Sequence, residues 1–171
     1  LLSAADSACA AAKEGGRNRV YNYQENDIDL MKRRKEMQWA ARISNALDKE
    51  LFLLHFQGVY RAEDGALSHL EALIRMTDER NPDQLIMPTH FIQPAEKSGR
   101  ILDIDRWVIH EVLRRLAGNP AIPSIAINLS GRSLSEPSLP QYISDELRQA
   151  GVNPSRLIVE ITETAAVSDL H

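Results

Sequence analysis

The sequence has 171 residues, of which 20 are Lys or Arg and 24 are Asp or Glu, so its formal net charge is −4. This acidic balance argues against a general nucleic-acid binder, which normally presents a basic face. The single Cys9 excludes an intramolecular disulfide and a cysteine-based zinc cluster. No apolar run approaches the roughly 20 residues of a membrane span, and the N-terminal stretch is not a signal peptide. We therefore expect a cytoplasmic globular segment without membrane contact, cut from a longer protein.

The first part of the chain is predicted to be helical, with a short strand between two helices. Residues 1–16 favour a helix ending at the pair Gly15-Gly16, and residues 17–24 favour a strand. Residues 25–32 are polar and read as a linker. A second helix is predicted over 31–47, and its single apolar stripe is typical of a helix that packs against a neighbouring domain.

From residue 49 the pattern changes to strands and helices in alternation. Strands are predicted over 51–60 and 68–76, joined as an antiparallel hairpin by a turn at 63–65, and residues 78–88 are predicted to be a loop. The remaining predicted elements are a helix over 89–99, a helix over 103–118 capped by Asp103, a strand over 124–130, a helix over 138–151 and a strand over 157–163. This order predicts an α/β fold with parallel strand pairing.

Each predicted strand has one apolar face and one face broken by a polar residue. In a (β/α) barrel the site lies at the carboxyl ends of the strands, where Glu71, Asn128 and Glu160 would meet. Two carboxylates and an amide oxygen suit Mg²⁺ or Mn²⁺ rather than zinc. Gln57 and Arg75 would then hold an anionic substrate. The alternative is that each residue is a solvated strand end or a simple hydrogen-bonding partner, and the pattern alone leaves both interpretations open.

Several stretches of the chain, in their order and spacing, resemble one known family. They are LEALIRM, FIQPAEKSG, DIDRWVIHEVLRRL, IAINLSGRSL and LIVEITET. These resemble the EAL domain, a family of bacterial cyclic-di-GMP-specific phosphodiesterases with a TIM-barrel-like fold. Upstream, the chain resembles the last helix and strand of a GGDEF (diguanylate cyclase) domain and the linker helix of tandem GGDEF–EAL proteins. The resemblance implies the end of a GGDEF-like domain at 1–24, a linker helix at 25–48 and the N-terminal half of an EAL domain at 49–171.

The resemblance also implies roles for individual acids and amides. Glu71, Asn128 and Glu160 match family metal ligands, and Glu71, Glu160 and Glu163 match the catalytic set, with Glu163 steadying a nearby loop. Two Mg²⁺ or Mn²⁺ ions would activate a water that hydrolyses cyclic-di-GMP to linear pGpG. The family's later paired aspartates and lysine are not in this sequence, so we expect this piece alone to be inactive.

Gln57 and Arg75 match substrate-contacting positions of the family, and two departures lie close to them. Arg75 is in LIRM where the family typically has LLRW, and Gly58 stands where many members have proline. The GGDEF motif itself is absent, which excludes cyclase activity for this piece.

Three further possibilities stay open from the sequence. One is a catalytically silent EAL module that binds cyclic-di-GMP or a partner protein; another is an unrelated Mg²⁺-dependent barrel hydrolase. Half a closed barrel has open strand edges, so we do not expect a stable closed barrel, and a homodimer through the EAL domain or the linker helix is a third possibility. His55 and His69 are interpreted as core or hydrogen-bonded histidines, and His110 lacks the second histidine of an HExxH site.

Overall fold

The computed structural model describes residues 28–161, so the elements predicted over 1–24 and Glu163 lie outside the described residues. The elements are α2 (Ile28–Asp48), β1 (Phe52–Tyr60), β2 (Leu67–Asp78), β3 (Asn81–Ile86), α3 (Pro88–Ser98), α4 (Ile101–Gly118), β4 (Ile125–Leu129), α5 (Gly131–Leu134), α6 (Leu139–Ala150), η1 (Pro154–Arg156) and β5 (Leu157–Ile161). Among these helices, none combines the length and apolarity that crossing a membrane requires.

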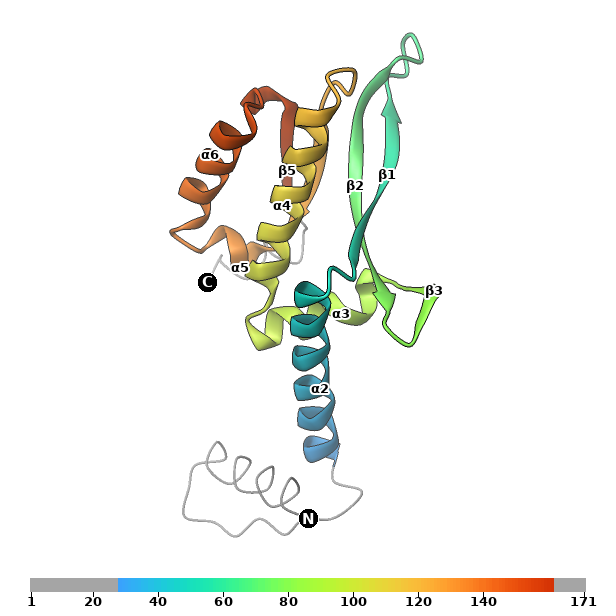
Figure 1. Ribbon diagram of the computed structural model, residues 1–171, viewed down its shortest axis with the longest axis vertical. Coiled ribbons are helices and arrows are strands. Elements are labelled where there is room, and N and C mark those ends of the chain that lie inside the picture. Colours follow the sequence, from blue (N-terminus) through green and yellow to red (C-terminus); the bar gives the residue numbers. More distant parts are fainter. Residues whose placement is uncertain (1–27, 162–171) are drawn as a thin grey trace.

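A single open sheet organises the described part of the chain, with the strand order β1-β2-β4-β5 and β3 paired to β2 (Figure 1). The first two strands are antiparallel, whereas β2 pairs with β4 and β4 with β5 in parallel. The parallel strands are joined through helices because a parallel connection must cross from one end of the sheet to the other. The predicted hairpin and parallel pairing are therefore confirmed.

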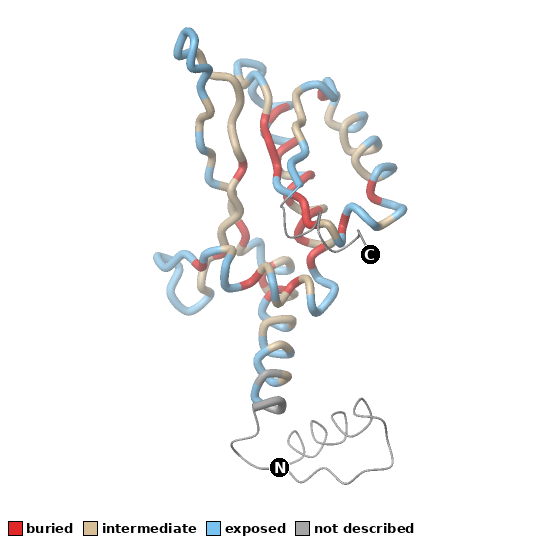
Figure 2. The backbone as a smooth tube through the Cα atoms, turned by 180° about the vertical axis from the view of Figure 1, so that it is seen from behind, coloured by how far each residue is buried: buried red, intermediate tan, exposed pale blue. Residues whose placement is uncertain are grey.

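The hydrophobic core lies between the sheet and α4. One stripe of α4, spaced three to four residues apart, is buried and includes Ile104, Val108, Val112 and Leu116. Figure 2 shows the buried residues gathered along β4 and the facing helix. Phe52 of β1 contacts both Phe91 of α3 and Trp107 of α4, with ring centroids 5.6 and 5.7 Å apart, so these aromatic rings join three elements.

The structure corrects three sequence-based expectations. Residues 78–88 are not simply a loop, because Asn81–Ile86 forms β3 and pairs with the end of β2. Asp103 does not cap α4: the helix begins two residues earlier, at Ile101, and Asp103 instead forms an ion pair with Arg100. A short helix, α5, follows β4 directly, and no helix was expected there.

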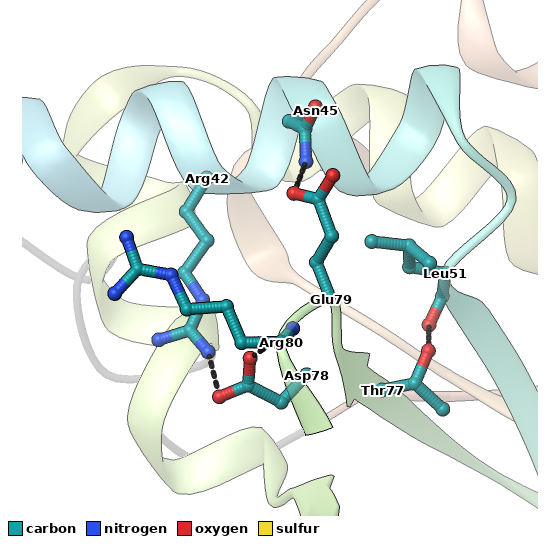
Figure 3. A network of polar contacts seen from close by, with 7 residues as sticks. All are labelled: Arg42, Asn45, Leu51, Thr77, Asp78, Glu79 and Arg80. Atoms are coloured by element: carbon teal, nitrogen blue, oxygen red, sulfur yellow. Dashed lines mark hydrogen bonds and ion pairs between the residues drawn. The ribbon is translucent and has the colours of Figure 1, made fainter. Parts of the chain in front are cut away.

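The helix α2 packs its apolar stripe onto α3 and into the same core. Ile43 and Ala46 are fully buried and belong to the hydrophobic cluster formed by the strands and α4. At the end of β2, the backbone N–H of Thr77 and its hydroxyl both donate to the carbonyl of Leu51, which follows α2 (Figure 3). The chain leaving α2 is thereby fixed to the same strand that carries Glu71 and Arg75.

Charged side chains reinforce this attachment (Figure 3). Arg42 of α2 pairs with Asp78 at 2.9 Å, and Asn45 donates to Glu79 at 2.8 Å. Lys49 also pairs with Glu79. The Arg80 backbone N–H, and after it the charge of Arg42, holds the pKa of Asp78 below its usual value.

The turn after α3 depends on Gly99, whose φ of 73° lies in the left-handed region, while its N–H bonds the carbonyls of the last helical turn. We expect Gly99→Ala to destabilise the fold by about 1 kcal/mol because a Cβ is strained at this φ. Gly118→Ala is the matched control: Gly118 has open space around its Cβ position and an ordinary φ. Urea denaturation should show a midpoint below that of the wild type for Gly99→Ala and not for Gly118→Ala. Equal midpoints for the two variants would contradict the left-handed conformation of Gly99.

Candidate functional site

Strand register places the predicted site residues on one face of the sheet. Gln57 of β1 is the register partner of Glu71 on β2, and Asn128 of β4 is the partner of Glu160 on β5. Glu71 in turn pairs with Ala126, two residues before Asn128. Because strand side chains alternate between faces and paired residues share a face, all four lie on the same side. The common face expected from the sequence is confirmed.

Contact between neighbouring strands brings two of these residues together. The amide Nδ2 of Asn128 donates to Oε1 of Glu71 at 2.9 Å. Asn128 and Glu160 are exposed and Glu71 is half-buried, whereas Ile127 and Leu129, on the opposite face of β4, are buried in the core. The polar face is therefore open to a ligand, while the apolar face holds the strands in place.

The donor set fits a hard divalent cation. The hydrogen bond to Glu71 uses the Nδ2 of Asn128 and leaves its Oδ1 outside this contact. Within residues 28–161, no group of three or more His, Cys, Asp or Glu side chains is arranged to hold a metal ion. The oxygen-bearing side chains on the shared face include Glu71, Glu160 and the amide of Asn128. Oxygen-only sets of this kind suit Mg²⁺ or Mn²⁺.

A cavity of about 230 Å³ adjoins the site. It lies beyond the last residues through which β2 pairs with β4. Arg75 and Asn128 line it from the sheet, and Pro88, Ile92 and Glu96 line it from α3. Arg75 is half-buried, and its Nη1 donates to the carbonyl of Ile74 at 2.7 Å. Drug-sized ligands occupy pockets of about 300–1,000 Å³, so this cavity would take one part of a larger ligand.

The structure brings two of the predicted site residues into contact, places two by strand register and does not describe one. Glu71 and Asn128 are in direct contact. Glu160 lies at the matching register position on the next strand, and Gln57 is exposed beside Glu71. Glu163 lies outside the described residues. What these residues bind stays a prediction.

One polar residue near the site was not singled out from the sequence. Asp105 of α4 is only 4% exposed and accepts hydrogen bonds from the backbone N–H of Ser130 at 3.2 Å and from its hydroxyl at 3.0 Å. Burial raises the pKa of Asp105, and the hydrogen bonds from the serines oppose this rise. An acid on the buried stripe of an otherwise apolar helix face was the signal that could have identified it.

Known proteins resemble this chain along its whole length. Residues 40–171 match the EAL domain family. The cyclic di-GMP phosphodiesterase PdeB of Shewanella oneidensis is 32% identical over 177 residues, which cover 100% of this chain and 20% of PdeB. The bifunctional diguanylate cyclase/cyclic di-GMP phosphodiesterase MucR of Pseudomonas aeruginosa is 33% identical over 173 residues, covering 99% of this chain and 25% of MucR. The chain thus spans a quarter or less of these relatives' length.

Solved structures agree with this relationship. The PaMucR phosphodiesterase in complex with c-di-GMP superposes with a TM-score of 0.69 at 32% identity, covering 77% of this chain and 54% of that one. The FimX EAL domain from Pseudomonas aeruginosa bound to c-di-GMP gives a TM-score of 0.69 at 29% identity, covering 76% of this chain and 52% of that one. Together with the shared α/β fold, these matches show that the chain belongs to the EAL domain family.

Proposed function

We propose that this chain is part of a bacterial signalling enzyme that hydrolyses cyclic-di-GMP to linear pGpG. The observation that carries the proposal is the shared strand face with Glu71, Asn128 and Glu160, on which the Asn128 amide is oriented by Glu71. Relatives in the same family are named cyclic di-GMP phosphodiesterases, and related structures are complexes with c-di-GMP. Both facts support the substrate class.

Metal-assisted hydrolysis is the proposed chemistry, with Glu71, Asn128 and Glu160 as ligands to Mg²⁺ or Mn²⁺. Such ions, in a pair, lower the pKa of a bound water and stabilise the charge that develops on the phosphate. The overall change breaks one P–O3′ ester bond: the oxygen of water joins phosphorus, and a proton ends on the released 3′ hydroxyl. The carboxylates of Glu71 and Glu160 supply the negative charge that holds the cations.

Substrate positioning is assigned to Gln57 and Arg75. Arg75 reaches the cavity beside Asn128 and can form paired hydrogen bonds to a phosphate or a base edge. Gln57 stands next to Glu71 on the exposed face, where its amide can donate to the ligand and accept from it. Because the chain as a whole has a net charge of −4, local cations at the site have to offset repulsion of a diphosphate.

The proposed domain arrangement places the end of a GGDEF-like domain at 1–24, a linker helix at 25–48 and the first half of an EAL domain at 49–171. The helix α2 at Ile28–Asp48 supports the linker assignment, since it is continuous and its C-terminal half buries Ile43 and Ala46 in the hydrophobic core.

Turnover by the full-length protein tests the proposal. Purified protein should convert cyclic-di-GMP to pGpG when Mn²⁺ or Mg²⁺ is supplied, and a chelator should abolish the reaction because the oxygen ligands alone do not activate water. Product formation is followed by chromatography, with a linear dinucleotide phosphodiester as the control substrate. Binding of cyclic-di-GMP without turnover in either metal would instead indicate a receptor, and equal turnover of both substrates an unspecific hydrolase.

A further inference from the structure

We propose that Asp105 is a positioning residue for the candidate metal site, a role that rests on the proposed function. Its buried carboxylate holds the turn between β4 and α5, and this turn fixes the end of the strand that carries Asn128. Asp105 belongs to α4, an element that contributes none of the predicted ligands. The hydrogen bonds of Asp105 to Ser130 therefore connect the helix layer to the site.

The contacts begin at the carboxylate. Its Oδ2 accepts from the backbone N–H of Ser130 at 3.2 Å and from the Ser130 hydroxyl at 3.0 Å, and both residues are buried. Two donors from one residue converge on one oxygen, so the position of Ser130 relative to α4 is fixed in two directions. Charge-assisted hydrogen bonds of this kind are stronger than those between neutral groups.

Ser130 passes this constraint to both of its neighbours in the chain. Its Oγ accepts from the backbone N–H of Ser133 at 3.1 Å, which makes Ser130 the N-cap of α5. In the other direction only Leu129, whose side chain is buried, separates Ser130 from Asn128. The amide of Asn128 is then held at its far end by Glu71. Asn128 is thus fixed both through its backbone and through its side chain.

Packing alone does not account for an acid at this position. A buried carboxylate is costly, and an apolar side chain would fill the same stripe of α4 at lower cost. An apolar residue would, however, leave the Ser130 N–H and hydroxyl without this acceptor. What the acid provides is the fixed geometry of the turn, which matters most where a ligand must be held within a narrow range of positions.

The experiment compares Asp105→Ala, Asp105→Asn and Ser130→Ala in the full-length protein, with Asp103→Ala as the matched control. Asp103 lies on the same helix, but its half-exposed carboxylate pairs with the exposed Arg100. We expect Asp105→Ala to weaken Mn²⁺ binding, measured by calorimetry, by about 10- to 100-fold, as for other residues that support metal ligands. Asp105→Asn keeps an oxygen that can accept from Ser130 and should recover most of the affinity.

Two further readouts separate positioning from other roles. Amide exchange at Ser133 and Leu134 should be faster in Asp105→Ala and Ser130→Ala than in Asp103→Ala. With cyclic-di-GMP, kcat should fall while KM stays unchanged. A rise in KM alone, with normal Mn²⁺ binding, would mean that Asp105 contacts the nucleotide and would overturn the proposal.

The comparison remains decisive if one variant fails. Should Asp105→Ala not fold, Ser130→Ala removes only the hydroxyl contacts, and wild-type Mn²⁺ affinity in that variant would overturn the proposal. Turnover by the wild-type protein judges the proposed function, whereas the ratios between variants and wild type judge the role of Asp105. A wild-type protein that binds Mn²⁺ but does not hydrolyse cyclic-di-GMP would therefore refute the first and still test the second.

Discussion

Glu71→Gln is expected to reduce hydrolysis of cyclic-di-GMP in the full-length protein by more than about 100-fold, since changes even to residues that only support metal ligands cost about 10- to 100-fold. Glutamine has nearly the shape of glutamate, and its amide oxygen can still accept from the Nδ2 of Asn128. The fold should therefore survive. What is lost is the negative charge, and a neutral amide is a poorer ligand for Mg²⁺ or Mn²⁺ than a carboxylate.

Turnover at saturating Mn²⁺ is the measurement, and Glu63→Gln is the matched control. Glu63 carries the same side chain and is exposed near the turn that joins β1 to β2, so its amide variant should hydrolyse at the wild-type rate. Equal thermal unfolding of the two variants would show that the loss is chemical. A Glu71→Gln protein with wild-type turnover would remove Glu71 from the metal site.

The shared face of the site was predictable because the alternation of side chains between the two faces of a strand is a local property. Once 68–76 and 124–130 are assigned as strands, the alternation of side chains fixes which residues lie with Glu71 and Asn128. The register between strands is not local: it places Glu71 beside Ala126, so that Asn128 reaches Glu71 from a position nearer the end of the strand. Pairing of this kind depends on the tertiary fold.

The loop prediction at 78–88 failed for an equally physical reason. The strand β3 is six residues long, contains Pro82 and is exposed except at Ile86. It therefore lacks the alternation that indicates a strand, and Ile86 is its single β-branched residue. The strand conformation of β3 is stabilised by its antiparallel pairing with the end of β2, which its own sequence does not indicate. Asp105 escaped notice because an acid in a helix is normally assigned to the solvent face.

Phe91→Ala is the change with the largest expected effect on stability, because tertiary packing holds together the elements around the site. Phe91 is fully buried on α3 and packs against Phe52, which in turn contacts Trp107. Truncation leaves a cavity between α3 and β1, and we expect a loss of about 3–5 kcal/mol in the free energy of unfolding. Chemical denaturation should show a large fall in the midpoint.

Tyr60→Ala is the control for this prediction, because Tyr60 is also a large aromatic residue but is 65% exposed at the end of β1. Its removal should change the midpoint little. If Phe91→Ala unfolds at the wild-type denaturant concentration, α3 is not packed against β1 as the structure has it. The cavity beside Arg75, which α3 lines through Pro88, Ile92 and Glu96, would then lose that wall, and the assignment of Arg75 to substrate positioning would lose its support.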